Sequence, residues 1–199
     1  MSEVNFQILG LAASLRRASI HRGLLRAAHE VCPQGMACES FDLGRIPHFN
    51  ADVEAEGDPE PVRELKEKIR AYDAVLIASP EYDYAVPGVL TTALDWCLRS
   101  PSPFRHKPVG IAGASPSGAG TARGQMVLRQ ILLHGPAYVM PEPRMLIPNA
   151  YQRFDENGDL TDRETRQRLR RFLEALREWN ASLDRAGLLE QENAEWPAR

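Results

Sequence analysis

Residues 5–19 have the sequence NFQILGLAASLRRAS, which changes character halfway along. Residues 5–12 are a short apolar run of the kind that forms a buried strand. Residues 13–19 add hydroxyl groups and arginines, and apolar side chains then recur at helical spacing through residues 20–31. A strand, a polar loop and a helix in this order predict the first unit of an α/β fold.

The same alternation continues along the chain. Predicted strands lie at residues 5–12, 36–41, 74–79, 108–114 and 137–140, and predicted helices carry apolar stripes within residues 20–31, 62–69, 89–97, 126–132 and 161–179. The last helix is expected to start at Thr161, because Thr161 and Glu164 have the spacing of a capping box. Strands that alternate with helices predict one parallel sheet with crossover helices. Residues 74–79 are the most apolar strand, so we expect them at its centre.

Length and composition indicate a single globular domain. The chain has 199 residues, of which 43% are hydrophobic and 26% are charged. These values fit one sizeable core and exclude collagen-like, disordered and disulfide-scaffold classes. We expect the domain to span residues 1–185 and residues 186–199 to form a flexible tail, because the helical periodicity fades there.

The charge balance and the cysteines limit the partners and the compartment. Lysine and arginine number 24 against 27 acidic residues, a net charge of −3, so the chain lacks the basic surplus of a nucleic-acid or anionic-membrane binder. The longest apolar run, residues 74–78, is far shorter than the roughly 20 residues that cross a bilayer, and no secretory leader is visible. Cys32, Cys38 and Cys97 lack C-x-x-C spacing, which predicts buried, reduced thiols. We therefore expect a cytoplasmic protein with a small-molecule partner, no nucleic acid and no membrane.

In an open parallel sheet, ligands bind beyond the carboxyl ends of the strands, so the loops there matter most. The first of them, residues 13–19, offers the hydroxyls of Ser14 and Ser19, the guanidinium of Arg16 and the free N–H groups of a helix N-terminus. These groups together suit a phosphate monoester. The loop has neither the G-x-x-x-x-G-K-[ST] pattern of a triphosphate loop nor a dinucleotide fingerprint. An alternative is a serine helix cap beside two solvated arginines.

Two further loops contribute to the same edge. Residues 80–88 carry two tyrosines and two acids between prolines, a rigid aromatic and polar rim suited to a planar heterocycle or, alternatively, to a protein interface. Residues 115–121 contain Gly118 and Gly120, which let the backbone approach a ligand closely. Residues 155–159 contain acids and a glycine, but the glycine is misplaced for a calcium loop, so we expect a tight turn at Asn157-Gly158 and no metal site.

In their order and spacing, these loops make the chain resemble the NADPH-dependent FMN reductase family, which includes quinone, azo-dye and chromate reductases. The matching pieces are Ser14-Leu15-Arg16 with Ser19, Pro80-Glu81-Tyr82, Pro87-Gly88-Val89-Leu90, Leu94-Asp95-Trp96, Ser115 with Gly118, and the turn at residues 154–162. The resemblance covers about residues 4–179. It implies a flavodoxin-like three-layer α/β sandwich with a five-stranded parallel sheet in the order 2-1-3-4-5.

The resemblance also implies a cofactor site. Phosphate contacts would come from Ser14, Arg16, Ser19 and the His21 position, the ribityl chain and ring would lie along Pro80, Glu81, Tyr82 and Asp83, and Ser115 and Gly118 would flank the ring. The sequence departs from the family pattern in three places. His21 and Asp83 stand where asparagine is usual, and Gly120-Thr121 stands where two glycines are usual. His21 is therefore either a replacement contact on the phosphate side or a solvated residue of the first helical turn.

By the same resemblance, the protein would transfer hydride from NADPH or NADH through bound FMN to a small acceptor, which could be a quinone, a flavin, an azo compound or a metal oxyanion such as chromate. The cycle would be ping-pong at one open site, and no catalytic side chain is expected because the cofactor carries the chemistry. Two alternatives stay open: a flavodoxin-like electron carrier, which the net charge of −3 disfavours, and a non-catalytic flavin-binding module.

Two further expectations follow from this reading. A carboxylate at Asp83 near the pyrimidine edge of the flavin would lower its midpoint potential, so Asp83→Asn should raise the potential in a redox titration. The helix after Pro87-Gly88 would pack against a second copy, with Trp96 and Leu98 at the apolar centre of a homodimer or homotetramer interface, unless both residues simply cover the sheet.

Overall fold

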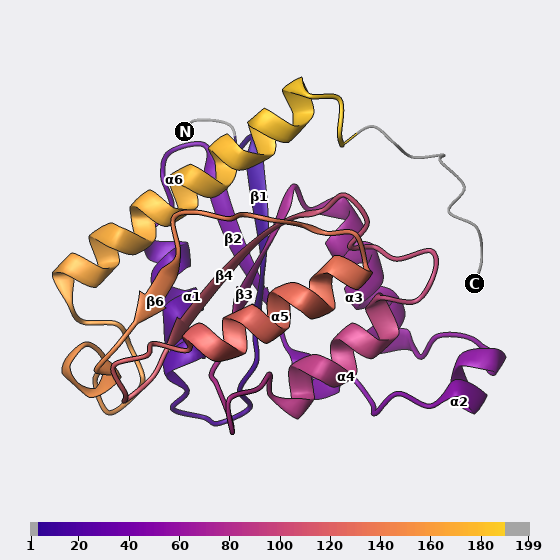
Figure 1. Cartoon of the computed structure of the whole chain (residues 1–199), viewed down its shortest axis with the longest axis horizontal. Coiled ribbons are helices and arrows are strands. Elements are labelled where there is room, and N and C mark those ends of the chain that lie inside the picture. Colours follow the sequence, from indigo (N-terminus) through magenta and orange to yellow (C-terminus); the bar gives the residue numbers. More distant parts are fainter. Residues whose placement is uncertain (1–3, 190–199) are drawn as a thin grey trace.

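The computed structural model of the chain describes residues 4–189 as a parallel sheet with helices on both faces (Figure 1). The strands run in the order β2-β1-β3-β4-β5, and every pair is parallel. Their bounds are Phe6–Ala12 for β1, Met36–Phe41 for β2, Ala74–Ala78 for β3, Pro108–Ala114 for β4, Tyr138–Val139 for β5 and Met145–Ile147 for β6. The predicted flavodoxin-like fold class is confirmed.

Strand β3 lies at the centre of the sheet, as its sequence predicts. All five of its residues are buried, and it pairs with β1 on one side and with β4 on the other. A strand that is covered on both faces needs no polar alternation, which is why Ala-Val-Leu-Ile-Ala is apolar throughout.

The fifth position of the sheet differs from the prediction because it is filled by two short strands. β5 pairs with the start of β4, at Pro108 and Val109, whereas β6 pairs with its end, at residues 112–114. Pro141 and Pro143 lie between the two strands, and proline lacks the N–H that a sheet ladder requires. The three residues of β6 are too few to show a strand pattern in the sequence.

Helices cover the two faces of the sheet unequally. Their bounds are Ile20–Val31 for α1, Ala51–Glu56 for α2, Glu60–Ala71 for α3, Gly88–Cys97 for α4, Ala122–His134 for α5 and Arg163–Arg185 for α6. Side chains of α1 and α6 join one hydrophobic core, and those of α3, α4 and α5 join the other, as the layers in Figure 1 indicate. All the predicted helices are present. The short α2, which buries no residue, was not predicted.

Helix α6 begins later than the sequence predicts. Asp162 is its N-cap, and the carboxylate of Asp162 accepts a hydrogen bond from the backbone N–H of Thr165 at 2.8 Å. Thr161 instead donates its hydroxyl to the carbonyl of Arg153. The predicted capping box at Thr161 and Glu164 is therefore wrong, because the adjacent aspartate competes for the cap position. Of the predicted tail, residues 190–199 lie outside the described residues, and the domain bounds stay a prediction.

Trp96 is buried inside its own chain and cannot form the centre of an interface. The side chain is 0% exposed, its indole N–H donates to the carbonyl of Pro47 at 2.9 Å, and its ring packs edge-on against Phe49 at 4.9 Å. Leu98 packs against the second core. The prediction of a two-fold contact through Trp96 is wrong, because the segment after β2 covers this side of α4.

The cysteines behave largely as the sequence predicts. Cys38 and Cys97 are buried, Cys32 is partly buried, and all three are free thiols. Burial raises the pKa of Cys38 and of Cys97 to about 12, so neither forms a thiolate near neutral pH. Within residues 4–189, no helix is both long enough and apolar enough to cross a membrane.

Candidate functional site

The predicted loops start side by side at one edge of the sheet. The N–H of Ala13 donates to the carbonyl of Ala78, the N–H of Ser79 donates to the carbonyl of Ala112, and the N–H of Ser115 donates to the carbonyl of Ile147. The chain leaves β1 toward β2 on one side and leaves β3 toward β4 on the other, so the edge between β1 and β3 is the switch point of the sheet. Ligands of such sheets bind at this point.

Residues 13–19, the predicted phosphate loop, have polar groups without a partner in the described chain. Ser14 is 8% exposed, and its hydroxyl bonds to no group of residues 4–189. The backbone N–H groups of residues 15–18 likewise donate to nothing in the described chain. Ser19 is the N-cap of α1 and accepts from the N–H groups of His21 and Arg22 at 3.2 and 3.3 Å. Free N–H groups at a helix N-terminus favour an anion.

Two arginines of this region have different roles. Arg16 is exposed and donates to the carbonyl of Ala18 at 3.0 Å, so it stays at the rim of the phosphate loop. Arg22, which was not predicted, donates to the carbonyl of Ser14 at 3.3 Å and to the carboxylate of Asp42 at 2.9 Å. Arg22 thereby connects the loop to Asp42, which follows β2. Its position inside a helix gave no sequence signal for this contact.

A hairpin from the far end of the chain supports the phosphate loop as well. Phe154 and Leu160 form an antiparallel bridge, and Gly158 has a φ of +80°, which confirms the predicted tight turn. The carboxylate of Asp155 accepts from the N–H groups of Asn157 and Asp159 at 3.0 and 2.8 Å. This carboxylate is thus engaged within the turn.

The hairpin touches α1 so closely that only glycine fits. A Cβ on Gly23 would lie 1.6 Å from the carbonyl oxygen of Gly158, and a Cβ on Gly158 would lie 2.9 Å from the carbonyl oxygen of Ala18. Arg26 adds a hydrogen bond to Asp159 at 2.7 Å. Two glycines far apart in the sequence therefore permit the contact that holds the phosphate loop in place.

His21 is buried beneath the phosphate loop. Its Nε2 accepts the backbone N–H of Ala114 at 3.2 Å, and the ring lies next to the backbone of Ser79, which favours a raised pKa. Loss of solvation by burial lowers the pKa of His21 to about 3, so the imidazole is neutral. The interpretation of His21 as a solvated first-turn residue is wrong, because α1 turns this side chain toward the ends of β3 and β4.

The second loop, residues 80–88, makes a two-residue turn at its tip. Tyr82 and Ala85 pair in an antiparallel bridge, with N–H to carbonyl distances of 3.2 and 2.8 Å. Asp83 and Tyr84 between them have φ values of +50° and +66°, as a type I′ turn requires. Tyr82, Asp83 and Tyr84 are exposed, whereas Pro80 is buried at the base. The effect of Asp83 on a flavin potential stays a prediction.

The side chain of Glu81 points to α5 and away from the open edge of the sheet. It is 8% exposed, and its carboxylate accepts the N–H of Gly124 at 2.8 Å and binds the guanidinium of Arg123 at 2.9 Å. That guanidinium lies 4.0 Å from the centre of the Tyr84 ring. Glu81 therefore caps α5 across two loops, so only its backbone is left to line a ligand. Arg123 and Tyr84 were not predicted as members of this cluster.

The third loop keeps Gly118 open. A Cβ on Gly118 would meet nothing within 4 Å, while the Ser115 hydroxyl contacts Ser117 at 3.0 to 3.2 Å. Thr121 holds a φ of +73° and accepts a hydrogen bond from Gln125 at 3.2 Å. The residue that replaces the usual glycine thus adopts the left-handed conformation, held by its buried hydroxyl.

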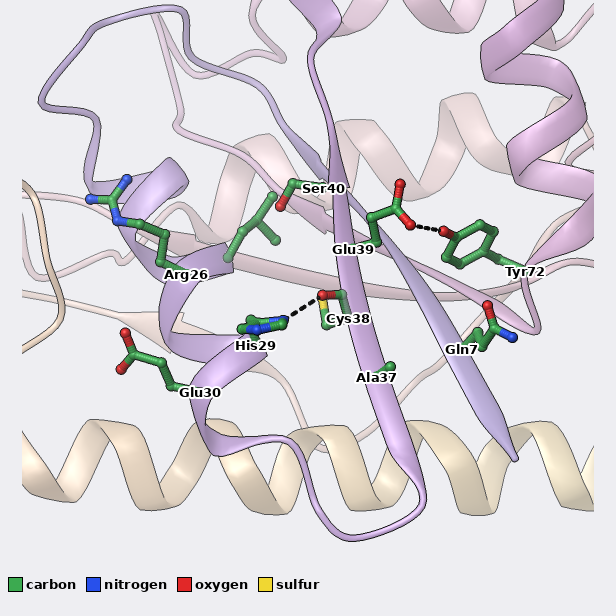
Figure 2. A pocket seen from close by; sticks show the side chains of 10 residues that line it. Gln7, Arg26, His29, Glu30, Ala37, Cys38, Glu39, Ser40 and Tyr72 are labelled. Carbon is green, nitrogen blue, oxygen red and sulfur yellow. Dashed lines mark hydrogen bonds between the residues drawn. The ribbon is translucent and has the colours of Figure 1, made fainter. Parts of the chain in front are cut away.

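A separate hollow of about 630 Å³ runs along the edge strand β2. Figure 2 shows two hydrogen bonds among the residues that line it: His29 Nδ1 lies 3.0 Å from the carbonyl of Cys38, and the Tyr72 hydroxyl donates to Glu39. None of the predicted site residues lines it. We place the functional site at the carboxyl edge, because unpartnered polar groups gather there. Within residues 4–189, no cluster of histidine, cysteine and acidic residues could hold a metal.

Comparison with known proteins identifies the class and then the family. A parallel sheet in this order, with an anion-receptive loop at the switch point between β1 and β3, defines a flavodoxin-like α/β protein. Residues 6–152 match the model of the NADPH-dependent FMN reductase family, and the chain belongs to this family.

Relatives and solved structures agree with this assignment. A Pseudomonas aeruginosa protein named NAD(P)H-dependent FMN reductase is 41% identical over 88% of this chain and 95% of its own length. A Solanum tuberosum protein named NAD(P)H:quinone oxidoreductase is 41% identical over 85% of this chain and 90% of its own. The flavoenzyme FerB of Paracoccus denitrificans, an NAD(P)H:(acceptor) oxidoreductase, is 29% identical with a TM-score of 0.80, covering 89% of this chain and 98% of that one.

Proposed function

We propose that this protein is an FMN-dependent oxidoreductase that passes hydride from NADPH or NADH to a small acceptor. Quinones are the acceptor class that the names of several relatives support. Free flavins, azo compounds and metal oxyanions such as chromate remain further acceptors to test. The observation that carries the proposal is the phosphate loop, whose free N–H groups and unpartnered Ser14 hydroxyl lie at the switch point of the sheet.

The residues at this edge fit FMN. The N–H groups of residues 15–18 and the Ser14 hydroxyl would supply donors for a phosphate, Ser19 aligns the helix N-terminus, and Arg16 adds an exposed positive charge at the rim. The backbone from Pro80 to Asp83 and the open Gly118 would line the rest of the molecule. When bound, FMN would supply the atom that accepts and donates hydride.

The chain's own contribution is binding and orientation. The exposed rings of Tyr82 and Tyr84 lie on a turn that is fixed by its own hydrogen bonds, so they offer flat apolar surface at a defined place. Glu81 neutralises Arg123 beside them, which keeps that guanidinium from attracting an acidic acceptor on its own. A site of this kind would select planar molecules more by shape than by hydrogen bonding, and would therefore accept several classes of planar acceptor.

We expect a homodimer or homotetramer whose interface does not use Trp96. Among the exposed apolar side chains, Met126 and Leu133 both lie on α5, at 62% and 73%. A sedimentation mass equal to that of one chain would contradict the oligomer.

The decisive experiment follows the two half-reactions separately. FMN-loaded protein is mixed without oxygen first with NADPH or NADH and then with a benzoquinone, and the flavin absorbance is recorded at each step. The proposal expects fast bleaching by a nicotinamide and fast recovery with the quinone. Slow bleaching with fast recovery would indicate an electron carrier. Failure to bind FMN would contradict the proposal altogether.

A further inference from the structure

The imidazole of His21 occupies a place in the sheet that a backbone hydrogen bond would normally fill. The paired residues of β3 and β4 run to Ala78 and Ala112, and the N–H of Ser79 still donates to the carbonyl of Ala112 at 2.9 Å. In a parallel ladder that kept this register, the next hydrogen bond would join the N–H of Ala114 to the carbonyl of Ser79. The N–H of Ala114 instead donates to Nε2 of His21 at 3.2 Å.

The ring touches both halves of this interrupted rung. It accepts from Ala114 at 3.2 Å and lies close enough to the backbone of Ser79 for that backbone to raise its pKa, while the backbone N–H of His21 donates to the N-cap hydroxyl of Ser19. Ser79 and Ala114 are the residues from which the second and third loops leave the sheet. One side chain on the first turn of α1 therefore joins the phosphate loop to both other loops of the site.

An apolar residue at position 21 could fill the same space, but it would change the hydrogen bonding of the strand ends. An apolar side chain here would leave the buried N–H of Ala114 without an acceptor, or would let it return to the carbonyl of Ser79 and draw the two strand ends together. The neutral ring avoids both outcomes, since its unprotonated Nε2 accepts from Ala114. The spacing of the strand ends then depends on the width of an imidazole.

We propose that His21 is a positioning residue, which holds the ends of β3 and β4 apart and sets the distance from the phosphate loop to the two loops that follow these strands. The proposal rests on FMN as the ligand of this site. A single ligand that is gripped by its phosphate at one loop and by its ring at the others requires those loops at fixed separation. The His21 residue is 3% exposed and its ring bonds to the sheet, so its role is to position these loops.

Three variants test this role. His21→Leu removes the acceptor, His21→Gln carries an amide that reaches about as far as Nε2, and Ile69→Ala is a core truncation on α3 that destabilises the fold without touching the site. FMN dissociation constants are measured by fluorescence quenching, and the apo-protein stability of each variant by urea unfolding. His21→Leu is expected to weaken FMN binding about tenfold or more, and His21→Gln to restore it to within about threefold.

The outcomes separate this proposal from the proposed function. Wild-type protein that fails to bind FMN contradicts the function, whereas wild-type binding with an unchanged His21→Leu contradicts only the positioning role. Equal loss of affinity in His21→Leu and Ile69→Ala at equal loss of stability would also overturn it. If His21→Leu does not fold, the wild type still decides: a nitrogen–nitrogen NMR coupling across the bond from Ala114 to Nε2 must be present, and its absence overturns the proposal.

Discussion

The phosphate loop and the loop after β3 lie at the same sheet edge, yet they use their polar groups in opposite ways. In the phosphate loop the backbone N–H groups of residues 15–18 and the Ser14 hydroxyl bond to nothing in the described chain. In residues 80–88 the turn closes on its own backbone, and Glu81 is bonded to α5. The first loop therefore has donors free to bind an anion, whereas the second loop has a conformation fixed by its own hydrogen bonds.

The difference also shows in what holds each loop in shape. The contacts that hold the phosphate loop come from outside it. Arg22 bonds to the carbonyl of Ser14, and the hairpin at Gly158 packs against Ala18. His21, just after the loop, bonds to the end of β4. The second loop carries its strain within itself, at Asp83 and Tyr84 with positive φ. A loop that must leave its donors free for a ligand cannot use them for its own structure, so its supports must lie elsewhere.

The largest effect is expected from a negative charge in the phosphate loop. Ser14→Asp places a carboxylate among the free N–H groups, where it repels a phosphate and competes for its donors. We expect FMN affinity to fall by at least about 100-fold and riboflavin affinity to change little, because riboflavin lacks the phosphate. Ser14→Ala, which only removes one donor, serves as the matched control with a loss of about tenfold. Equal losses for the two flavins would place the phosphate elsewhere.

The pH dependence of stability tests the burial of His21 next to the phosphate loop. The pKa of His21 is lowered from 6.5 to about 3 by burial, so between these values the unfolded chain binds a proton that the folded chain does not. Stability should therefore fall as the pH drops from 6.5 toward 3, by up to about 1.4 kcal/mol per pH unit from this group. Urea unfolding of the wild type and of His21→Gln at several pH values isolates the contribution, since other titrating groups are common to both. Parallel curves would show that the ring is accessible to protons.

Removal of the Glu81 carboxylate should cost stability more than ligand affinity. Glu81→Ala deletes the acceptor of the Gly124 N–H and the partner of Arg123, with an expected loss of about 2 kcal/mol in the free energy of unfolding. Glu81→Gln keeps an acceptor for Gly124 and should recover about half of this loss. Asp95→Asn, an exposed acid on α4, controls for net charge. A large loss of FMN affinity without loss of stability would mean that the Glu81 side chain contacts FMN, as the family resemblance implies.

The smallest effect is expected at the tip of the second loop. Tyr84→Gly relieves the left-handed strain, worth about 1 kcal/mol, and loses the contact with Arg123, worth about 0.5 to 1 kcal/mol. The two terms offset, so the free energy of unfolding should change by less than about 1 kcal/mol. Thermal or urea unfolding measures the change directly. A loss well beyond that limit would mean that the turn depends on the Tyr84 ring more than on its own hydrogen bonds.

Sequence patterns located the strands, the helices and the three loops, because burial on one face or on two faces imposes a short-range period on apolar residues. They also singled out the first of these loops as a candidate phosphate site, since Ser14, Arg16 and Ser19 lie within one strand-to-helix turn. The split fifth strand and the α6 cap escaped them. In both places neighbouring residues compete locally: Pro141 and Pro143 against a continuous ladder, and Asp162 against Thr161.

The amino-acid sequence alone determined the α/β architecture, the central place of β3 and the presence of an anion-receptive first loop. Tertiary structure decided where individual polar and aromatic side chains point: Trp96 under the segment after β2, Glu81 onto a helix 43 residues away, and His21 into a sheet rung 93 residues away. The reason is physical. A period in the sequence records which face of an element is buried, but a hydrogen bond between distant residues depends on where the packed elements bring their backbones, and no local pattern records that.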